Sequence, residues 1–394
     1  MLRAYKYRLQ PTRAQERTLF GWLATTREVY NIALGQRRDV WAQQRKAVSL
    51  HDQYAQIPEI RDARTDIAAV PVVVLRGALR RLDLAFRAFF HRCEVGEKPG
   101  YPRFKNRHRW NSILIDDLCG KATIVAGGRR VNVPLLGKVK FRQHRPIEGR
   151  PKVLRLLVDG VGRWWVVFAC ADVPTKPRPS TGREVGIDLG LTALVATSDG
   201  ERCANPRHLA GAQRALARAQ RRVSRRRHGS NRRRKAVRLL AKRHTHVAAV
   251  RRENHIKIAH DLVARYDLIC HENLNICGLA QSRLARAVGD AGWASLLHWI
   301  ACKAEEAGRE TVGVNPNGTS QQCSACEAWP TVRKDLSVRV HRCEACGYVA
   351  DRDVNAARNI LRLGRSLRRG TLGCNGIPET REGAMCPAAH CPTG

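Results

Sequence analysis

Two Cys-x-x-Cys pairs constrain the fold of this chain more than any other feature of its sequence. Cys323 and Cys326 form one pair, Cys343 and Cys346 the other, and sixteen residues separate them. Such pairs are typical of zinc ribbons, in which four thiolates from two turns complete a tetrahedron. Because the polar segment between the pairs has no core of its own, we expect a structural zinc site here. We expect His341 at the surface, since four cysteines already close the site.

Three acidic residues lie at the ends of predicted elements. Asp188 ends the apolar run 185–188, Glu272 ends the run 268–272, and Asp353 begins a helix. Apolar strands that bring carboxylates to one sheet edge make a site for two divalent cations, which can activate water against a phosphodiester. The order predicts a metal-dependent nuclease whose zinc module is inserted between the second and third acidic residues.

Taken singly, each of these acidic residues is more simply interpreted as a helix cap or a turn residue than as a metal ligand. Asp351 also competes with Asp353 for the third ligand position. We prefer Asp353 because it starts the first helical turn, where Asn355 is placed to support the site.

The charge of the chain points to a polyanionic partner. There are 71 Lys and Arg against 34 Asp and Glu among 394 residues, a formal net charge of +37. This excess favours nucleic acid. No stretch approaches the roughly 20 apolar residues needed to span a bilayer, and the first ten residues lack the pattern of a signal peptide. We therefore expect a protein of the cytoplasm with reduced cysteines.

The densest basic tract lies in a predicted helical region. Between Asn205 and Lys257 there are eighteen Lys and Arg and one acid, Glu253. A run with so little compensating acid predicts salt-dependent contact with phosphates and no reading of base sequence. The arginines that we expect to contact nucleic acid are Arg221, Arg222, Arg225, Arg226, Arg227, Arg232, Arg233 and Arg234.

An aromatic and basic segment around residues 101–110 admits two interpretations. Tyr101, Phe104 and Trp110 alternate with basic residues, as in surfaces that stack on bases. The same aromatic residues are equally suited to the core of a β domain.

Periodicity divides the chain into a helical part, a β part and an α/β part. Residues 2–10 alternate as a strand, Thr12 and Gln15 form a capping box, and residues 12–95 have mostly helical spacing. Short apolar runs between 110 and 172 predict an antiparallel barrel or meander, which the first strand can join. The proline-rich segment 173–182 is expected to be a linker.

Beyond the linker we expect a hairpin of strands 184–188 and 191–197, and strands at 266–271 and 311–314. Helices are expected at 291–308 and 353–363. The remainder, 365–394, has no periodicity and is expected to be disordered. It contains Cys374, Cys386 and Cys391.

With these motifs in view, the chain resembles the TnpB (OrfB) family of transposon-associated RNA-guided endonucleases, relatives of type V CRISPR effectors. The resemblance covers nearly the whole chain. It rests on residues 5–12 (YKYRLQPT), 100–105 (GYPRFK), 186–190 (GIDLG), 271–274 (HENL), the four cysteines and 350–360 (ADRDVNAARNI). Asn273 departs from the Asp that often follows the second acid, which leaves the metal ligands intact.

The resemblance implies a multidomain α+β protein. A β-barrel wedge domain (1–10 and 100–173) would carry an inserted helical recognition domain (11–99). After a linker (174–183), a RuvC, RNase H-like nuclease domain (184–315 and 348–364) would contain an inserted zinc ribbon (316–347). Asp188, Glu272 and Asp353 would bind two Mg²⁺ ions, and a transposon-derived guide RNA would pair with double-stranded target DNA.

Two other functions remain open at this point. A transposase that acts directly on the ends of its own element uses the same chemistry and would yield joined products. A zinc-containing DNA-binding regulator without catalysis belongs to another class, and the presence of all three acids argues against it.

Overall fold

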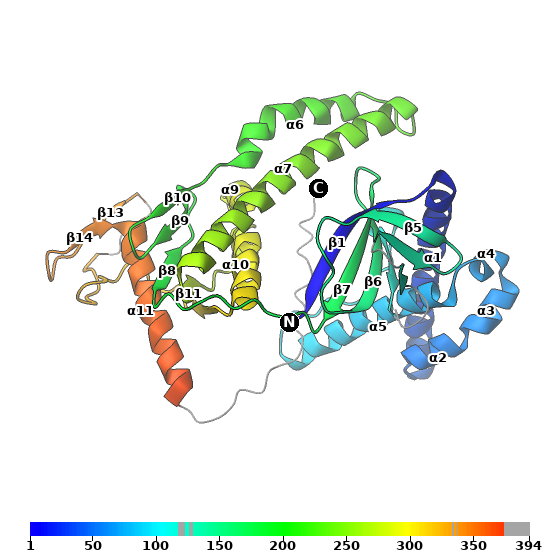
Figure 1. Ribbon diagram of the computed structural model, residues 1–394, viewed down its shortest axis with the longest axis horizontal. Coiled ribbons are helices and arrows are strands. Elements are labelled where there is room, and N and C mark those ends of the chain that lie inside the picture. The colour runs from blue at the N-terminus through cyan, green and yellow to red at the C-terminus, as the bar shows by residue number, and fades with distance from the viewer. Residues whose placement is uncertain (117–122, 126–128, 333–334, 336, 374–394) are drawn as a thin grey trace. The chain divides into compact units, whose positions relative to one another are not determined.

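The computed structural model describes residues 1–116, 123–125, 129–332, 335 and 337–373. The chain divides into two compact units, one of residues 1–175 with 212–248, the other of residues 176–211 with 249–394. No helix in the described ranges is long and apolar enough to cross a bilayer. Figure 1 labels the helices and strands.

The first unit is built on a seven-stranded antiparallel sheet of order β2-β6-β7-β1-β5-β4-β3. Its strands are β1 (Arg3–Gln10), β2 (Ser112–Ile115), β3 (Thr123–Ile124), β4 (Arg130–Val133), β5 (Gly137–Arg142), β6 (Arg150–Val158) and β7 (Trp164–Ala171). The first strand joins the β domain as the alternation allowed, because Tyr5, Tyr7 and Leu9 all face the core. The expected barrel is not closed. Among the described pairings β2 and β3 are edges, so the sheet is a half-barrel.

A helical segment is inserted between β1 and β2. It consists of α1 (Arg13–Gln44), α2 (Leu50–Ala55), α3 (Ile57–Ala63), α4 (Thr65–Ala68) and α5 (Val72–Glu94). The predicted capping box starts α1: Thr12 accepts from the Gln15 amide at 3.2 Å, and the Gln15 side chain accepts from the Thr12 amide at 3.0 Å. Helices α1 and α5 pack together and against β2.

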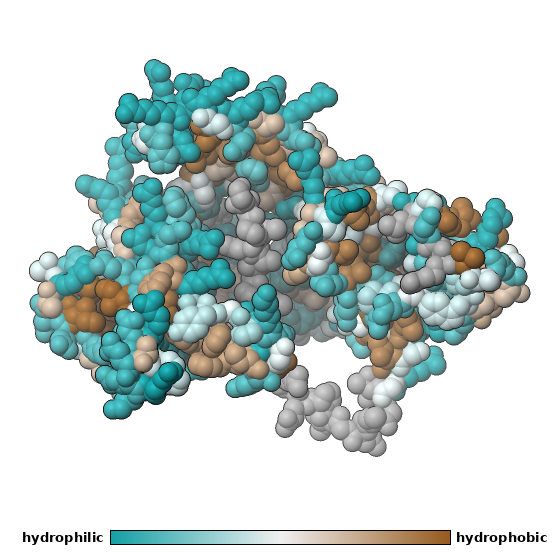
Figure 2. All heavy atoms as spheres, turned by 180° about the vertical axis from the view of Figure 1, so that it is seen from behind, coloured by the Kyte–Doolittle hydropathy of each residue, from teal (hydrophilic) through white to brown (hydrophobic). Residues whose placement is uncertain are grey.

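Two long basic helices follow strand β10 (Arg202–Ala204) along the chain. They are α6 (His208–Ser224) and α7 (Asn231–Arg265), joined by residues 225–230. Their long hydrophilic side chains project from the upper edge of Figure 2.

The second unit contains a five-stranded sheet of order β10-β9-β8-β11-β12. Strands β8 (Glu184–Asp188), β11 (Leu268–Glu272) and β12 (Glu310–Val314) run parallel, whereas β9 (Ala193–Thr197) and β10 (Arg202–Ala204) are antiparallel to their neighbours. Helix α11 (Arg352–Gly373) packs on β8, β11 and β12. A separate core joins β8 and β11 to the end of α7, α9 (Ala285–Ala291) and α10 (Trp293–Ala307).

The linker is docked rather than free over part of its length. The amides of Lys176 and Arg178 donate to carbonyl oxygens at the end of α10, at 2.8 and 3.0 Å. Asp267 accepts from the Thr181 and Gly182 amides at 2.9 and 2.8 Å. Residues 176–182 are therefore held within the second unit by hydrogen bonds from their backbone amides.

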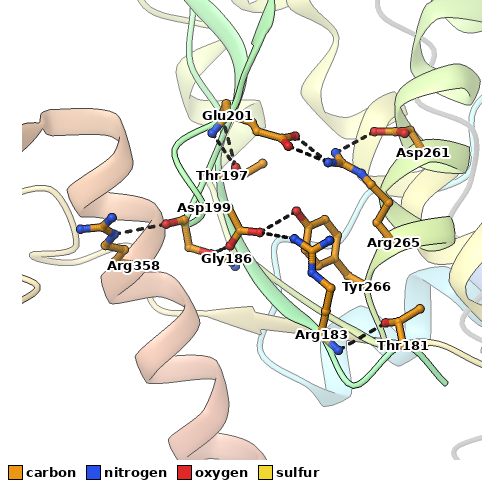
Figure 3. Close-up of polar contacts among 11 residues, drawn as sticks. Thr181, Arg183, Gly186, Thr197, Asp199, Glu201, Asp261, Arg265, Tyr266 and Arg358 are labelled. Carbon is orange, nitrogen blue, oxygen red and sulfur yellow. Dashed lines mark hydrogen bonds and ion pairs between the residues drawn. The ribbon is translucent and has the colours of Figure 1, made fainter.

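A network of hydrogen bonds and ion pairs lies at the end of the sheet opposite Asp188 (Figure 3). The buried Tyr266 hydroxyl donates to Asp199 at 2.9 Å, and burial raises the pKa of Tyr266 to about 12. Arg183 reaches the same Asp199 oxygen at 2.8 Å, and Arg265 pairs with Glu201 at 2.7 Å. Bonds between the loop after β9 and the end of α7 thus fix the start of β8.

The expectation of disorder from residue 365 onward is wrong for its first nine residues. Helix α11 continues to Gly373 because its basic side chains find acidic partners on the strands below. Arg365 and Arg368 pair with Glu184 at 2.5 and 3.1 Å, and Arg368 also pairs with Glu310 at 2.9 Å. Residues 374–394, with the three C-terminal cysteines, lie outside the described residues.

Candidate active site and zinc turns

Parallel pairing brings Asp188 and Glu272 to one edge of the sheet. Strands β8 and β11 pair with His271 opposite Ile187, so both strands end together. The carboxyl ends of parallel strands meet at the same edge, and both acidic side chains follow apolar residues that fix the strands in the core.

Helix α11 delivers the third acid across the face of the sheet. At Gly186 of β8, an added Cβ would lie 2.0 Å from the Ala357 carbonyl oxygen, so only glycine permits this approach. Asp353 lies in the first turn of this helix, near enough for its charge to raise the pKa of Asp188.

The charges of Glu272 and Asp353 act on the buried carboxyl of Asp188. Burial, then the charges of Glu272 and Asp353, raises the pKa of Asp188 from 3.8 to about 7. Burial also raises the pKa of Glu272, and a hydrogen bond from Thr319 opposes that shift. Repulsion among partly buried carboxylates is relieved when they bind a cation, so this arrangement fits divalent metal ions with oxygen ligands.

Asp351 has a different role in the structure. Its Oδ1 accepts from the Asp353 amide at 2.9 Å and the Val354 amide at 3.3 Å, which makes it the cap of α11. Asp353, rather than Asp351, raises the pKa of Asp188. The geometry therefore favours Asp353 over Asp351 at the carboxylate site.

Sequence reasoning missed two residues at this edge. Arg202, from β10, donates to Asp351 and Asp353 at 2.9 Å each. Thr319 is 3% exposed and donates its hydroxyl to Glu272. Neither has a motif that marks it, since a lone arginine and a threonine in a loop carry no spacing signal.

The four cysteines converge as predicted. Their ligand atoms all lie within 4.8 Å of one another, and in the described part of the chain no other group of His, Cys, Asp or Glu does so. The three carboxylates are not gathered that tightly. Sγ atoms of Cys323 and Cys346 are 3.8 Å apart, and those of Cys326 and Cys343 are 3.5 Å apart. Four sulfurs bound tetrahedrally at about 2.3 Å from zinc lie about 3.8 Å from each other, so the site fits the ion.

Both cysteine turns have the same backbone geometry. The Glu327 amide donates to the Cys323 carbonyl and the Gly347 amide to the Cys343 carbonyl, each at 3.0 Å. Glu327 and Gly347 are left-handed, with φ of 62° and 73°. The backbone amide of Cys346 lowers the pKa of the Cys343 thiol, which favours the thiolate that zinc binds.

His341 is not at the surface, contrary to our expectation. It is 1% exposed and its ring lies 6.2 Å from that of Tyr348. The imidazole of His341 therefore packs against the phenol ring that follows the second cysteine pair.

The eight arginines predicted to contact nucleic acid are mostly exposed and have no acidic partner among the described residues. Seven of the eight predicted arginines are exposed and Arg233 is half-buried. No carboxylate in the described ranges pairs with any of them, which leaves their charge available to phosphates. A shallow depression is lined by Arg218, Arg221, Arg222, Arg225 and Arg226.

The aromatic segment divides between the two interpretations. Trp110 is a core residue, 3% exposed, whose indole donates to Thr26 at 3.0 Å. Tyr101 and Phe104 are 46% and 51% exposed, and the Arg38 guanidinium lies 5.4 Å from the Phe104 ring. Only the two exposed rings are available for stacking.

Comparison with known proteins agrees with the order of these features. Three family models match: a helix-turn-helix domain of the OrfB_IS605 group (residues 1–46), the OrfB_IS605 "Probable transposase" (168–283) and the "Cas12f1-like, TNB domain" (293–360). The last spans the zinc turns and the start of α11.

Two relatives match along most of their length. The chain is 35% identical to a "Putative RNA-guided DNA endonuclease" of Streptomyces pristinaespiralis, over 92% of this chain and 89% of that protein. It is 27% identical to InsQ of Escherichia coli K12, which bears the same description, over 97% of both. A Cas12f1 structure solved with sgRNA and target DNA has a similar fold, with a TM-score of 0.56 and 14% identity over 91% of this chain and 98% of that one. The chain therefore belongs to the TnpB (OrfB) family of the IS605 type, as the resemblance of its motifs indicated.

Proposed function

We propose that this chain is an RNA-guided, Mg²⁺-dependent DNA endonuclease of a bacterial transposon. It would act in the cytoplasm, on nucleoid DNA paired to a transposon-derived guide RNA. Two observations support the proposal: Asp188 and Glu272 end neighbouring parallel strands at the same sheet edge, and burial, then the charges of Glu272 and Asp353, raises the pKa of Asp188 to about 7. The similarity to relatives described as RNA-guided DNA endonucleases supports the proposal that a guide RNA directs the cleavage.

The second unit corresponds in this proposal to a RuvC, RNase H-like nuclease. In its sheet β10, β9 and β8 are mutually antiparallel neighbours, and β11 and β12 continue the sheet parallel to β8. The zinc turns lie between β12 and α11 along the chain. The half-barrel and helices α1–α5 of the first unit would be the wedge and recognition domains that hold guide RNA and heteroduplex. Base pairing then selects the target sequence.

Asp188, Glu272 and Asp353 are the residues that would hold two Mg²⁺ ions. When bound, these ions supply an activated water and stabilise the leaving oxygen of the phosphodiester. The chain positions the ligands: β8 and β11 hold two carboxylates at a fixed register, and the Asp351 cap holds the helix start that carries the third. Arginines on α6 and α7 attract phosphates without reading bases.

The proposal is tested by sequencing the RNA that copurifies with the full-length Asp188→Ala protein. We expect a homogeneous RNA that carries the end of a mobile element. Absence of a defined RNA contradicts the guided part. Products in which element ends are joined, formed without guide RNA, would instead indicate a transposase.

A further inference from the structure

A buried polar chain connects the zinc turns to the carboxylate edge. It begins at Thr319, whose hydroxyl donates to Glu272. The Pro316 carbonyl lies 3.1 Å from the same hydroxyl oxygen, but its single proton favours the charged acceptor. A carboxylate that accepts such a bond has one oxygen fixed and one left for a ligand.

Thr319 is itself held by helix α11. The backbone carbonyl of Thr319 accepts a hydrogen bond from the side-chain Nδ2 of Asn359 at 2.9 Å. The same Nδ2 also donates to the Gln322 carbonyl at 2.7 Å. Asn359 is fully buried, and its Oδ1 has no hydrogen-bond partner within the described residues. Burying an acceptor without a partner costs free energy. The two bonds that the side-chain amide donates to the loop offset part of this cost.

A second buried side-chain amide, that of Asn355, forms two hydrogen bonds with the first zinc turn. Its Nδ2 donates to the Gln322 carbonyl at 2.8 Å and its Oδ1 accepts from the Ser324 amide at 2.9 Å. These two backbone groups flank Cys323, which is 1% exposed. The position of one zinc ligand is thus tied to α11, the helix that also carries Asp353.

We infer that Thr319, anchored by Asn359, is a positioning residue that links the order of the zinc turn to the placement of Glu272. The inference rests on the proposed function, because Glu272 is there a metal ligand. Zinc fixes Cys323, Asn355 and Asn359 fix the loop beside it, and Thr319 aligns the carboxylate. Outer-shell partners of this kind typically change metal affinity or activity about 10–100-fold when removed.

The test compares Thr319→Val, which removes the hydroxyl at nearly constant volume, with Thr319→Ser, which keeps it. Thr331→Val is the matched control, since Thr331 donates to Glu344 at 2.8 Å in the same zinc-binding region without contacting Glu272. Mn²⁺ affinity of the full-length protein is measured by electron paramagnetic resonance, and zinc content by elemental analysis.

We expect Thr319→Val to weaken Mn²⁺ binding at least about 10-fold with zinc content unchanged, and Thr319→Ser and Thr331→Val to bind as the wild type does. Removing zinc from the wild type should weaken Mn²⁺ binding similarly and have little further effect on Thr319→Val. Unchanged Mn²⁺ affinity in Thr319→Val, failure of Thr319→Ser to restore it, or no response to zinc removal each overturns the inference. A wild type that responds as expected but cleaves no DNA would defeat the proposed function alone.

Discussion

Replacing Asp188 by asparagine should stabilise the protein while abolishing its chemistry. The Asp188 carboxyl has its pKa raised to about 7 by burial and by the charges of Glu272 and Asp353. In the unfolded chain this pKa returns to its ordinary value of 3.8. The folded state therefore binds the proton more tightly, and ionisation penalises folding.

The sign and the pH window follow from these two values. Below 3.8 the carboxyl is protonated in both states and there is no penalty; the penalty grows as pH rises and is complete above about 7. The gap corresponds to roughly 4 kcal/mol. The Asp188→Asn change keeps the shape and removes the charge. Because the amide loses part of this gain through imperfect hydrogen bonding, we expect the free energy of unfolding to rise by about 2–4 kcal/mol at pH 8.

Thermal unfolding of full-length protein in magnesium-free buffer that contains zinc measures this gain. For a unit of this size we expect the midpoint of Asp188→Asn to rise by about 5–10 °C at pH 8, and the difference to shrink towards pH 4. Mg²⁺ should raise the midpoint of the wild type but not of the variant.

Asp199→Asn is the control for this experiment. Asp199 is paired with Arg183 and accepts from Tyr266 at the other end of the sheet, so its neutralisation should lower the midpoint. If Asp188→Asn melts at or below the wild-type temperature at pH 8, the reasoning that burial and the charges of Glu272 and Asp353 penalise ionised Asp188 is refuted.

Three further predictions follow from the site. Asp353→Asn should abolish cleavage, whereas Asp351→Ala should leave cleavage measurable and cost about 1 kcal/mol through the lost cap, as compared by cleavage assay and melting. Gly186→Ala should destabilise the second unit by about 3 kcal/mol or more, because its Cβ meets the Ala357 carbonyl; a melting midpoint equal to wild type contradicts this close approach. Changing Arg225, Arg226 and Arg227 (residues 225–227) to Gln should weaken RNA binding for all sequences and lower the slope of log affinity against log salt by about 2, whereas a loss confined to one sequence contradicts phosphate contact.

Features with a short sequence spacing could be predicted well. The cysteine pairs come together because each turn is local and the two turns need only one mutual contact. The strand predicted at 184–188 has those bounds, the one predicted at 266–271 lies at 268–272, and their parallel pairing places Asp188 and Glu272 at the same edge. The capping box at Thr12 was predicted from four residues and is present.

Features that depend on tertiary packing could not be predicted. Thr319 is separated by 47 residues from the carboxylate that it contacts, and Arg202 by 151 residues from Asp353. His341 was expected at the surface because four cysteines already close the zinc site, but its side chain is buried. The extension of α11 depends on Glu184, which no local pattern links to Arg365.

Cleavage of plasmid DNA by the purified protein bound to its RNA tests the central claim most directly. Wild-type complex, Glu272→Gln complex and Thr331→Val complex would be incubated with a plasmid that matches the guide and with one that does not, each with and without Mg²⁺. The account predicts that wild type and Thr331→Val linearise only the matching plasmid and only with Mg²⁺, while Glu272→Gln retains RNA and cuts neither. Undiminished cutting by Glu272→Gln, or equal cutting of both plasmids by the wild type, would contradict it.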